Sequence, residues 1–162
     1  MTRPGDDPPF PGNLVPGFVL HMVDLRHQDP KYHFYVILNE KPDTDPWLVI
    51  AMATSKVDKV KAHMTARKLP PDTAVELQPG EYPHFSQPTI FNCNDVDIFP
   101  MATIKGRLED GLVQYRRCVS PEVLQRLREA ALKSPTLEPK YQKLIRPPVQ
   151  APSDAPKPAD PA

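Results

Sequence analysis

The sequence predicts a mainly β fold: a small β-barrel of about six or seven short strands, followed by one C-terminal amphipathic α-helix. Two observations lead to this prediction. Short apolar segments rich in β-branched and aromatic residues recur along the chain, and turn signals separate them at intervals of about 8 to 12 residues. One segment near the C-terminus instead carries an apolar stripe at helical spacing behind a helix-start signature. This pattern is typical of a barrel that a helix plugs or flanks.

The 162 residues suit a single domain with proline-rich ends. The chain contains 23 prolines, which concentrate in residues 1–12 and 146–162. Segments of this composition cannot bury enough apolar surface to offset the entropy of ordering the chain. We expect both ends to be disordered tails, with the domain spanning residues 13–145.

Two continuous apolar runs, residues 33–38 and 47–53, form the centre of the predicted sheet. The segment between them, residues 39–46, is rich in proline and aspartate and therefore predicts a turn. Neither run alternates cleanly between apolar and polar residues, so we expect both strands to be covered on two faces, as in a closed barrel. A first strand at residues 18–25 and a polar turn at residues 26–31 complete an antiparallel meander.

The segment after this meander turns basic. Residues 56–68 hold five cations against Asp58 alone, and the pattern fits either a short amphipathic helix or an extended loop. Such a charge run is either a solvated face or a phosphate-contacting loop. Further short strands or apolar pieces are expected at residues 74–77, 89–93, 96–99, 101–104 and 112–118, with a turn at residues 105–111.

The C-terminal helix is predicted from its start. Ser120 suits the N-cap and Pro121 the first helical position. Apolar residues then recur at a spacing of i, i+4, which predicts a helix over residues 121–133, and residues 139–145 add a further turn or two. The polar residues of the helix are expected on its outward face: Gln125, Arg126, Arg128 and Glu129.

Composition and motifs exclude several classes of function. The chain has 20 basic and 20 acidic residues, so any nucleic-acid site must rest on a local patch. Cys93 and Cys118 lack the spacing of a zinc site and suit reduced, buried thiols of a cytoplasmic protein. The chain shows no charged N-terminal region followed by the apolar stretch of a signal peptide, and no apolar run approaches about 18 residues, so neither export nor membrane insertion is expected.

Candidate functional residues gather in two places. Thr54, Ser55 and Lys56 follow the second apolar run at the point where a buried strand reaches the surface. Tyr82, His84 and Phe85 lie in a proline-rich loop. These aromatic residues either seal one end of the barrel or offer a base-stacking surface beside an imidazole.

Five motifs occur in a fixed order along the chain: PGFV at residues 16–19, VIL at 36–38, VIAMATS at 49–55, IFNCN at 90–94 and IKGRL at 104–108. In this order they resemble the MazF/PemK-like toxins, over residues 16–132. The resemblance implies an SH3-like barrel that forms a homodimer. It also implies metal-independent cleavage of single-stranded RNA and inhibition by an antitoxin protein.

The resemblance places the family's catalytic threonine or serine at Thr54 or Ser55. Its second catalytic residue is an arginine that opens the strand at residues 33–38. This chain has His33 there, with Lys31 two residues earlier. Either His33 takes over as the proton donor, or the chain keeps the barrel and lacks this chemistry.

Cleavage of RNA through its own 2′-hydroxyl needs a base, an acid, and cations or hydroxyls that stabilise the charged phosphorane. Histidine suits the acid or base role because its reference pKa is about 6.5. No metal or cofactor is expected. The candidate catalytic residues are His33, Thr54 and Ser55, and the candidate RNA-binding residues are Lys31, Lys56, Lys59, Lys61, Tyr82, His84 and Phe85.

Two hypotheses follow. The first is a cytoplasmic, toxin-like endoribonuclease that acts on single-stranded RNA and pairs with an antitoxin. The second is a catalytically inactive SH3-like barrel that binds a protein or a nucleic acid through the same surface. The proline-rich C-terminal segment suits the second hypothesis, because such a segment serves as a ligand or a tether.

Overall fold

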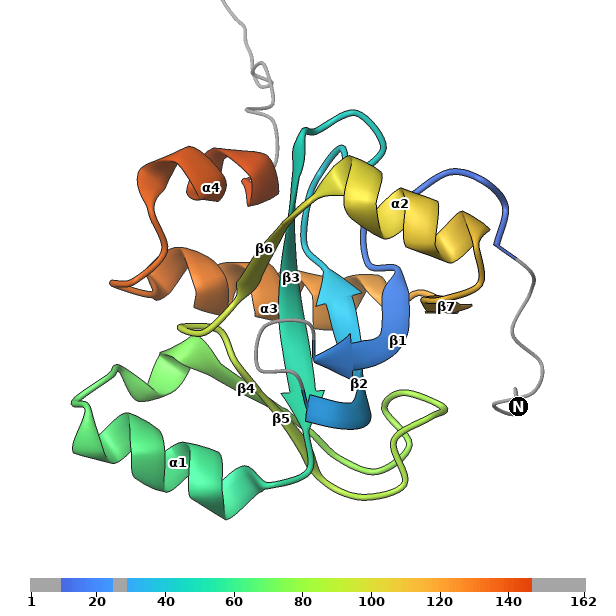
Figure 1. Cartoon of the computed structure of the whole chain (residues 1–162). Helices are drawn as coiled ribbons and strands as arrows, with labels where there is room; N and C mark the ends of the chain where they lie inside the picture. The colour runs from blue at the N-terminus through green and yellow to red at the C-terminus, as the bar shows by residue number, and fades with distance from the viewer. Residues whose placement is uncertain (1–9, 25–28, 147–162) are drawn as a thin grey trace, which may run out of the picture.

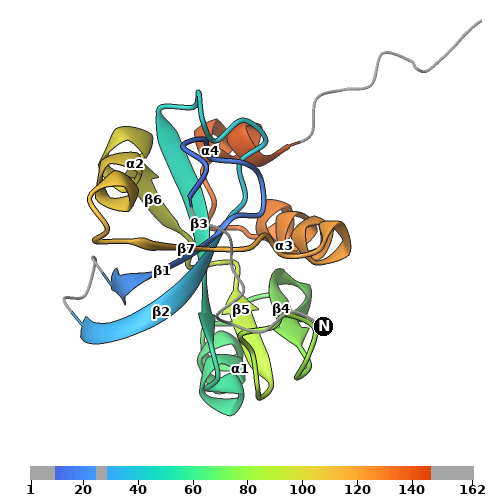
Figure 2. The same ribbon diagram turned by 90° about the vertical axis from the view of Figure 1, so that its right-hand side faces the viewer.

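The computed structural model describes residues 10–24 and 29–146. Within them the chain forms a seven-stranded antiparallel sheet and four α-helices, so the fold is mixed α/β (Figures 1 and 2). The strands are β1 (Val19–Asp24), β2 (Asp29–Ile37), β3 (Trp47–Thr54), β4 (Ala74–Leu77), β5 (Thr89–Asn92), β6 (Asp97–Pro100) and β7 (Gln114–Arg116). The helices are α1 (Val57–Ala66), α2 (Met101–Glu109), α3 (Pro121–Lys133) and α4 (Pro139–Ile145), with a 3₁₀ turn η2 (Pro71–Thr73).

Strand β3 is the centre of the sheet, whose order is β4-β5-β3-β2-β1-β7. One edge of β3 pairs with β2, with Tyr35 opposite Met52 and Ile37 opposite Ile50. The other edge pairs with β6 along its first half and with β5 at its end. The predicted hairpin and the meander of the first three strands are therefore confirmed.

The two faces of the sheet build two hydrophobic cores. Val36 and Ala51 belong to a core on the side of α3, where Leu127 packs. Tyr35 and Ile50 point the opposite way and belong to a second core that includes side chains of α2. Figure 2 shows α2 and α3 on opposite sides of the sheet. Both faces are buried over residues 35–37 of β2 and 48–51 of β3, as the continuous apolar runs predict.

Helices, rather than closure of the sheet, cover these faces. Within the described residues no pairing joins the edge strands β4 and β7, so the sheet is open and the expected barrel is not confirmed. The predicted number of strands and the C-terminal helix are both present. The chain contains more helix than expected. Four α-helices form, whereas the sequence predicted one helix at residues 121–133 and one or two further helical turns at residues 139–145.

Helix α2 is the main difference from the predicted elements. Residues 101–104 were expected as an apolar piece of the barrel and residues 105–111 as a turn. Pro100 instead precedes a helix in which Ile104 and Leu108, one turn apart, are the buried residues. A run of four apolar residues fits a strand and a buried helix equally well, and here packing decides. Helix α1 likewise resolves the open choice at residues 56–68 in favour of a helix.

Helix α3 begins as predicted, with the Ser120 hydroxyl accepting a hydrogen bond from the Val123 amide at 3.1 Å.

The expectation that Arg128 faces outward is wrong, because this residue is only 8% exposed. Its Nε donates to the Leu38 carbonyl at 2.8 Å and its Nη2 to the Asn39 carbonyl at 2.9 Å. Its Nη1 pairs with Glu40 at 2.6 Å. Burial lowers the pKa of Arg128, whereas Glu40 acts to raise it.

Asn39 organises the turn between β2 and β3. Its side chain is fully buried, and its Oδ1 accepts a hydrogen bond from the Val49 amide at 2.7 Å. Its Nδ2 donates to the Trp47 carbonyl at 2.8 Å and to Asp45 at 3.0 Å. One side chain therefore binds both the turn and the first residues of β3.

Several predictions concern residues outside the described part of the chain. The tails at residues 1–12 and 146–162 lie almost entirely there, as do residues 26–28 of the turn predicted at residues 26–31. Residues 29–31 of that predicted turn are instead the first residues of β2. Among the described helices, none combines the length and the apolar character that crossing a bilayer requires.

Candidate functional site

The candidate site lies where β2 and β3 part. Their pairing runs from Ile37 opposite Ile50 to Tyr35 opposite Met52. Continued by two residues, this register would place His33 opposite Thr54. Beyond Tyr35, however, β2 stays paired with β1, and β3 stays paired with β5. A cleft occupies the place of the missing pairing.

This first cleft has a volume of about 360 Å³, within the usual range of roughly 300–1,000 Å³ for small-ligand sites. It brings together residues of β2, the end of β3 and the loop before β5. The predicted residues that line it are Lys31, His33, Thr54, Ser55, Lys56, His84 and Phe85. Tyr32, which was not predicted, also lines it and is 51% exposed.

A second cleft of about 310 Å³ adjoins the first, because His33, Thr54 and Lys56 line both. The second cleft lies between the sheet and α1. Its further polar lining residues are Lys59 and His63 of α1, and Asn92 and Asp95 at the end of β5. Of these only Lys59 was predicted from the sequence. His63 follows Lys59 by one helical turn, a signal that depends on residues 57–66 being a helix.

The corner between β3 and α1 is suited to an anion. The Thr54 hydroxyl oxygen accepts a hydrogen bond from the Lys56 amide at 3.2 Å, which leaves its hydrogen to donate elsewhere. Helix α1 begins at the next residue, Val57, without a side-chain cap. The unpaired amides and the positive dipole end of a helix attract anions. The Lys56 ammonium adds a full charge at the same corner.

The loop over the first cleft is built on aromatic packing. The His84 ring lies 5.3 Å from Phe34 and 5.6 Å from Tyr82. Tyr82 is 2% exposed, and its hydroxyl donates to the Arg117 carbonyl at 2.6 Å. Phe85 is also buried. Tyr82 therefore anchors the loop from inside the core, Phe85 forms a buried wall, and Tyr32 is the exposed aromatic residue of the cleft.

Three histidines share one electrostatic neighbourhood at this site. His21 of β1 stacks on Phe34, with 4.4 Å between ring centroids. Burial lowers the pKa of His21, a hydrogen bond with Gln114 raises it, and the charges of Arg116, His84 and His33 lower it further. His21 was not predicted as part of the site, since only folding brings β1 beside the loop that carries His84.

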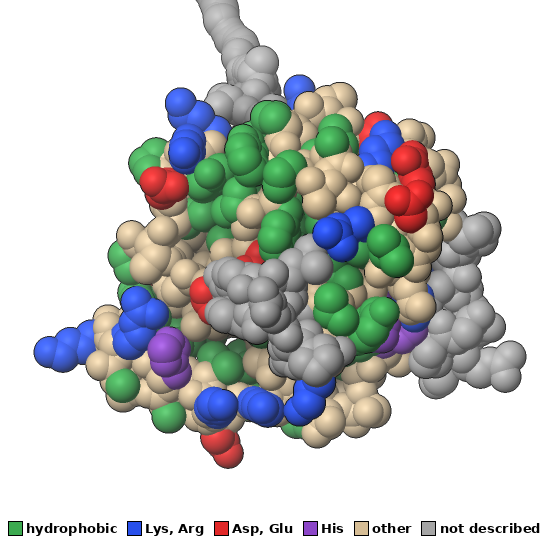
Figure 3. All heavy atoms as spheres, viewed as in Figure 1, with side chains coloured by type: hydrophobic (Ala, Val, Ile, Leu, Met, Phe, Trp, Pro, Cys, Tyr) green, Lys and Arg blue, Asp and Glu red, His purple; other side chains and the backbone are tan. Residues whose placement is uncertain are grey.

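The lining residues of the two clefts include three lysines, three histidines and a single carboxylate, that of Asp95. Lysine, arginine and histidine side chains gather over the α1 end of the molecule in Figure 3. A chain with equal numbers of acidic and basic residues thus has a local cationic surface. This is the kind of patch that nucleic-acid binding by such a chain requires.

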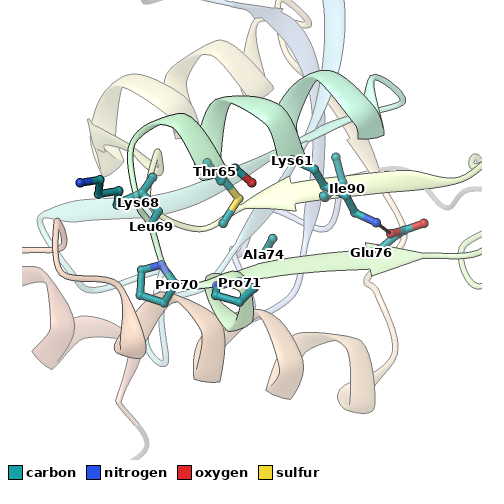
Figure 4. Close-up of a pocket in the computed structure, with 10 residues that line it drawn as sticks. Lys61, Thr65, Lys68, Leu69, Pro70, Pro71, Ala74, Glu76 and Ile90 are labelled. Atoms are coloured by element: carbon teal, nitrogen blue, oxygen red, sulfur yellow. Dashed lines mark ion pairs between the residues drawn. The ribbon is translucent and has the colours of Figure 1, made fainter.

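Lys61, also predicted, lies on the other side of α1. Its ammonium pairs with Glu76 of β4 at 2.9 Å, and this hydrogen-bonded pair lowers the pKa of Glu76 and raises that of Lys61. Figure 4 shows the pair at one end of a third, larger groove of about 710 Å³ between α1, η2 and strands β4 and β5. The groove is largely apolar, with Met64, Leu69 and Ile90 in its lining. Of the ten predicted site residues, it contains Lys61 alone.

The thiols do not contribute to the clefts. Cys93 is fully buried, and burial raises its pKa to about 12. Cys118 is partly buried, which also raises its pKa. Within residues 10–24 and 29–146, no group of three or more His, Cys, Asp and Glu side chains could hold a metal ion.

Comparison with protein-family models gives no match, and no curated protein matches the chain. The fold and the site therefore define the class of protein: a mixed α/β domain with two joined, cationic clefts at the end of an open antiparallel sheet. The chemistry of the clefts carries the functional argument.

Proposed function

We propose that this protein is a metal-independent, toxin-like endoribonuclease that cleaves single-stranded RNA in the joined clefts. One observation carries the proposal: His33, Thr54 and Lys56 line both clefts. An imidazole, a hydroxyl and an ammonium group thus come together from β2, from β3 and from the residue before α1. These are the three kinds of group that cleavage through the 2′-hydroxyl needs.

The scissile phosphate binds at the corner where β3 ends. The hydroxyls of Thr54 and Ser55 donate hydrogen bonds to its non-bridging oxygens. Lys56 and Lys31 balance the negative charge that grows as the phosphorane forms. The amides of the first turn of α1 support the same charge.

His33 and His84 carry the proton transfers, since both imidazoles line the first cleft. One neutral imidazole takes the proton of the 2′-hydroxyl, and the 2′-oxygen attacks the phosphorus. The other imidazole, protonated, gives its proton to the departing 5′-oxygen. The products are a 2′,3′-cyclic phosphate and a free 5′-hydroxyl.

A single strand is the form of RNA that this site accommodates. Tyr32 presents an exposed aromatic ring at the rim, and unpaired bases stack on such rings. Lys59 lies one turn along α1 from the phosphate corner, in the second cleft. It extends the cationic track for the backbone of the strand.

The resemblance to MazF/PemK-like toxins adds several points to the same proposal. It implies an SH3-like fold, a homodimeric state and an antitoxin partner, and the reduced cysteines add a cytoplasmic location to the proposal. The site supports it at Thr54 and Ser55, which match the family's catalytic position and lie in the first cleft. His33 stands where that family has arginine, so an imidazole replaces the guanidinium as the proton donor.

The direct test is cleavage of mixed-sequence single-stranded RNA by the purified protein in the presence of EDTA. We expect fragments with 2′,3′-cyclic phosphate ends, and a loss of rate of about 10²- to 10⁴-fold for His33→Ala. Lys56→Ala is also expected to lower the rate. The matched control, Lys61→Ala, removes a lysine from the opposite side of α1 and should change the rate little.

Two outcomes contradict the proposal in different ways. RNA binding without cleavage by the wild-type protein would favour the second hypothesis, a catalytically inactive binding domain. If the wild-type protein neither binds nor cleaves RNA, RNA is excluded as the ligand of the clefts.

A further inference from the structure

Asn92 and Asp95 lie at the two ends of one tight turn, and both line the second cleft. The Asp95 amide donates to the Asn92 carbonyl at 3.1 Å, which closes the turn directly after β5. The first and fourth residues of such a turn have Cα atoms within about 7 Å of each other. An amide side chain and a carboxylate are thereby presented to the same cleft as neighbours.

Asn94, inside the turn, determines how the Asn92 amide is oriented. The Asn94 backbone amide donates to Asn92 Oδ1 at 3.1 Å, and Asn94 Nδ2 donates to the same oxygen at 3.0 Å. A backbone N–H can only donate, so the atom it meets must be the oxygen of Asn92 and not the nitrogen. Since Oδ1 faces Asn94, Nδ2 is the polar atom that Asn92 can present to a ligand.

Asn94 is itself held by residues on its other side. Its Nδ2 donates to Thr73 Oγ1 at 2.6 Å, and its Oδ1 accepts from Ser134 Oγ at 2.6 Å. The Thr136 hydroxyl donates to the Asn94 carbonyl at 2.7 Å. Thr73 and Ser134 are buried. This network fixes the turn, and a fixed donor pays little entropy when it binds a ligand.

An amide donor beside a carboxylate acceptor is complementary to a lactam edge, in which a carbonyl stands next to a ring N–H. Uracil has such an edge at O4 and N3–H, and guanine has one at O6 and N1–H. Cytosine and adenine present the opposite order, an amino donor next to a ring-nitrogen acceptor. Unpaired RNA bases are commonly read on these edges.

We propose that the second cleft selects uracil or guanine next to the scissile phosphate. The Asn92 Nδ2 donates to the base carbonyl, and the Asp95 carboxylate accepts from the ring N–H. This inference rests on the proposed function, because the wall shared by the two clefts places the base beside the phosphate. His63 of α1 lines the same cleft.

The test uses a short DNA oligonucleotide that contains one ribonucleotide, which fixes the point of cleavage because no other nucleotide carries a 2′-hydroxyl. Each of the four bases is placed in turn at the ribonucleotide and at each of its two neighbours. At one of these three positions, oligonucleotides with uracil or guanine are expected to be cleaved at least about 10-fold faster than those with cytosine or adenine. Equal rates for all four bases at all three positions would overturn the inference.

The double variant Asn92→Asp with Asp95→Asn exchanges donor and acceptor without changing the net charge. An aspartate at position 92 still offers an oxygen to Asn94, so the turn keeps its hydrogen bonds. The preference is expected to invert toward cytosine and adenine. A purely structural role would lower all four rates by one factor and leave their ratios unchanged, which would count against base reading.

Asp58→Asn is the matched control, since it removes an exposed carboxylate in the first turn of α1 that lines neither cleft. It is expected to change all four rates by the same factor. If this variant changed the ratios of the four rates, the base preference would be an effect of charge alone, and the inference would be overturned.

The experiment separates this inference from the proposed function. Equal cleavage rates for the four bases would agree with the proposed nuclease activity and would contradict the proposed base selectivity. If the wild-type protein binds RNA without cleaving it, the same comparison is made on Kd by fluorescence anisotropy, where equal Kd values for the four bases overturn base reading. If it neither binds nor cleaves, both proposals fail.

Discussion

His33 and Thr54 occupy matching positions on β2 and β3, on the same face of the sheet, with an open cleft between them in place of a backbone pairing. His33 lies two residues from Tyr35, and Thr54 lies two residues from Met52, so each pair shares one face of its strand. Tyr35 and Met52 lie on the side of the sheet that faces α1 and α2, and His33 and Thr54 therefore do as well. A histidine and a hydroxyl are thus aligned by the register of a β-ladder. The strands that build the core therefore also hold these two side chains in place.

The Thr54 hydroxyl can be removed with almost no change of shape by Thr54→Val. We expect RNA cleavage to fall by about 10²-fold, because one donor to the phosphorane oxygens is lost. The measurement is the single-turnover rate on a fluorescent single-stranded RNA. Thr65→Val is the control, since Thr65 lies on the groove side of α1. A Thr54→Val rate equal to that of the control would remove Thr54 from the site.

Arg128→Met tests the connection between α3 and the end of β2. The substitution keeps the apolar stem but leaves the Leu38 and Asn39 carbonyls without these donors. We expect the free energy of unfolding to fall by about 1–3 kcal/mol for each carbonyl left unsatisfied, measured by urea denaturation. Arg126→Met removes an exposed pair with Glu81 and an exposed hydrogen bond to the Glu76 carbonyl, and it should cost less than about 1 kcal/mol because water can replace both. Equal losses in the two variants would contradict the buried role of Arg128.

His21 predicts a pH dependence of stability. Its pKa in the folded protein is lowered from the ordinary value of 6.5, first by burial. The unfolded chain therefore binds a proton more readily than the native protein as the pH falls through 6.5, so the native state loses stability in that direction. The neighbouring charges that enlarge this effect are Arg116, His84 and His33.

We expect His21→Gln to flatten the decline in unfolding free energy between about pH 7 and about pH 5.5. The measurement is urea denaturation at a series of pH values in buffers of constant ionic strength. A slope that stays unchanged in the variant would show that His21 does not cause it.

Cys93 and Cys118 should differ in their reaction with iodoacetamide. Cys93 is fully buried with a pKa raised to about 12, so almost no thiolate forms near neutral pH and none is accessible. We expect the native protein to be alkylated at Cys118 alone and the urea-unfolded protein at both residues. Peptide mass spectrometry identifies the labelled residue, and rapid native labelling of Cys93 would contradict its placement in the core.

The sequence predicts most of the sheet because the information is local. Apart from His33, the runs at residues 33–38 and 47–53 are apolar, and only strands buried on both faces need such runs. The start of α3 is equally local, since Ser120 caps the helix through its own side chain. Helix α2 was missed because a short apolar run does not distinguish a strand from a buried helix.

Residues that line the clefts were predicted where one segment carries several polar groups, and they were missed where separate segments converge. Thr54, Ser55 and Lys56 stand together in the chain and in the cleft. His63 and Asp95 reach the second cleft from a helix and a turn, and their meeting depends on tertiary packing. Arg128 was misplaced because a charged residue is usually exposed, and the carbonyls that it binds belong to a different part of the chain.

The Asn39 side chain lies at the far end of β3 from the clefts, yet its hydrogen bonds bear on which side chain of β3 lines them. Side chains alternate between the two faces of a strand, so a slip of β3 by one residue would carry Thr54 to the opposite face and bring a neighbouring side chain to its place. Asn39 holds both the Trp47 carbonyl and the Val49 amide, and so it prevents that slip. The face on which Thr54 lies is thus set in a buried turn at the other end of the same strand.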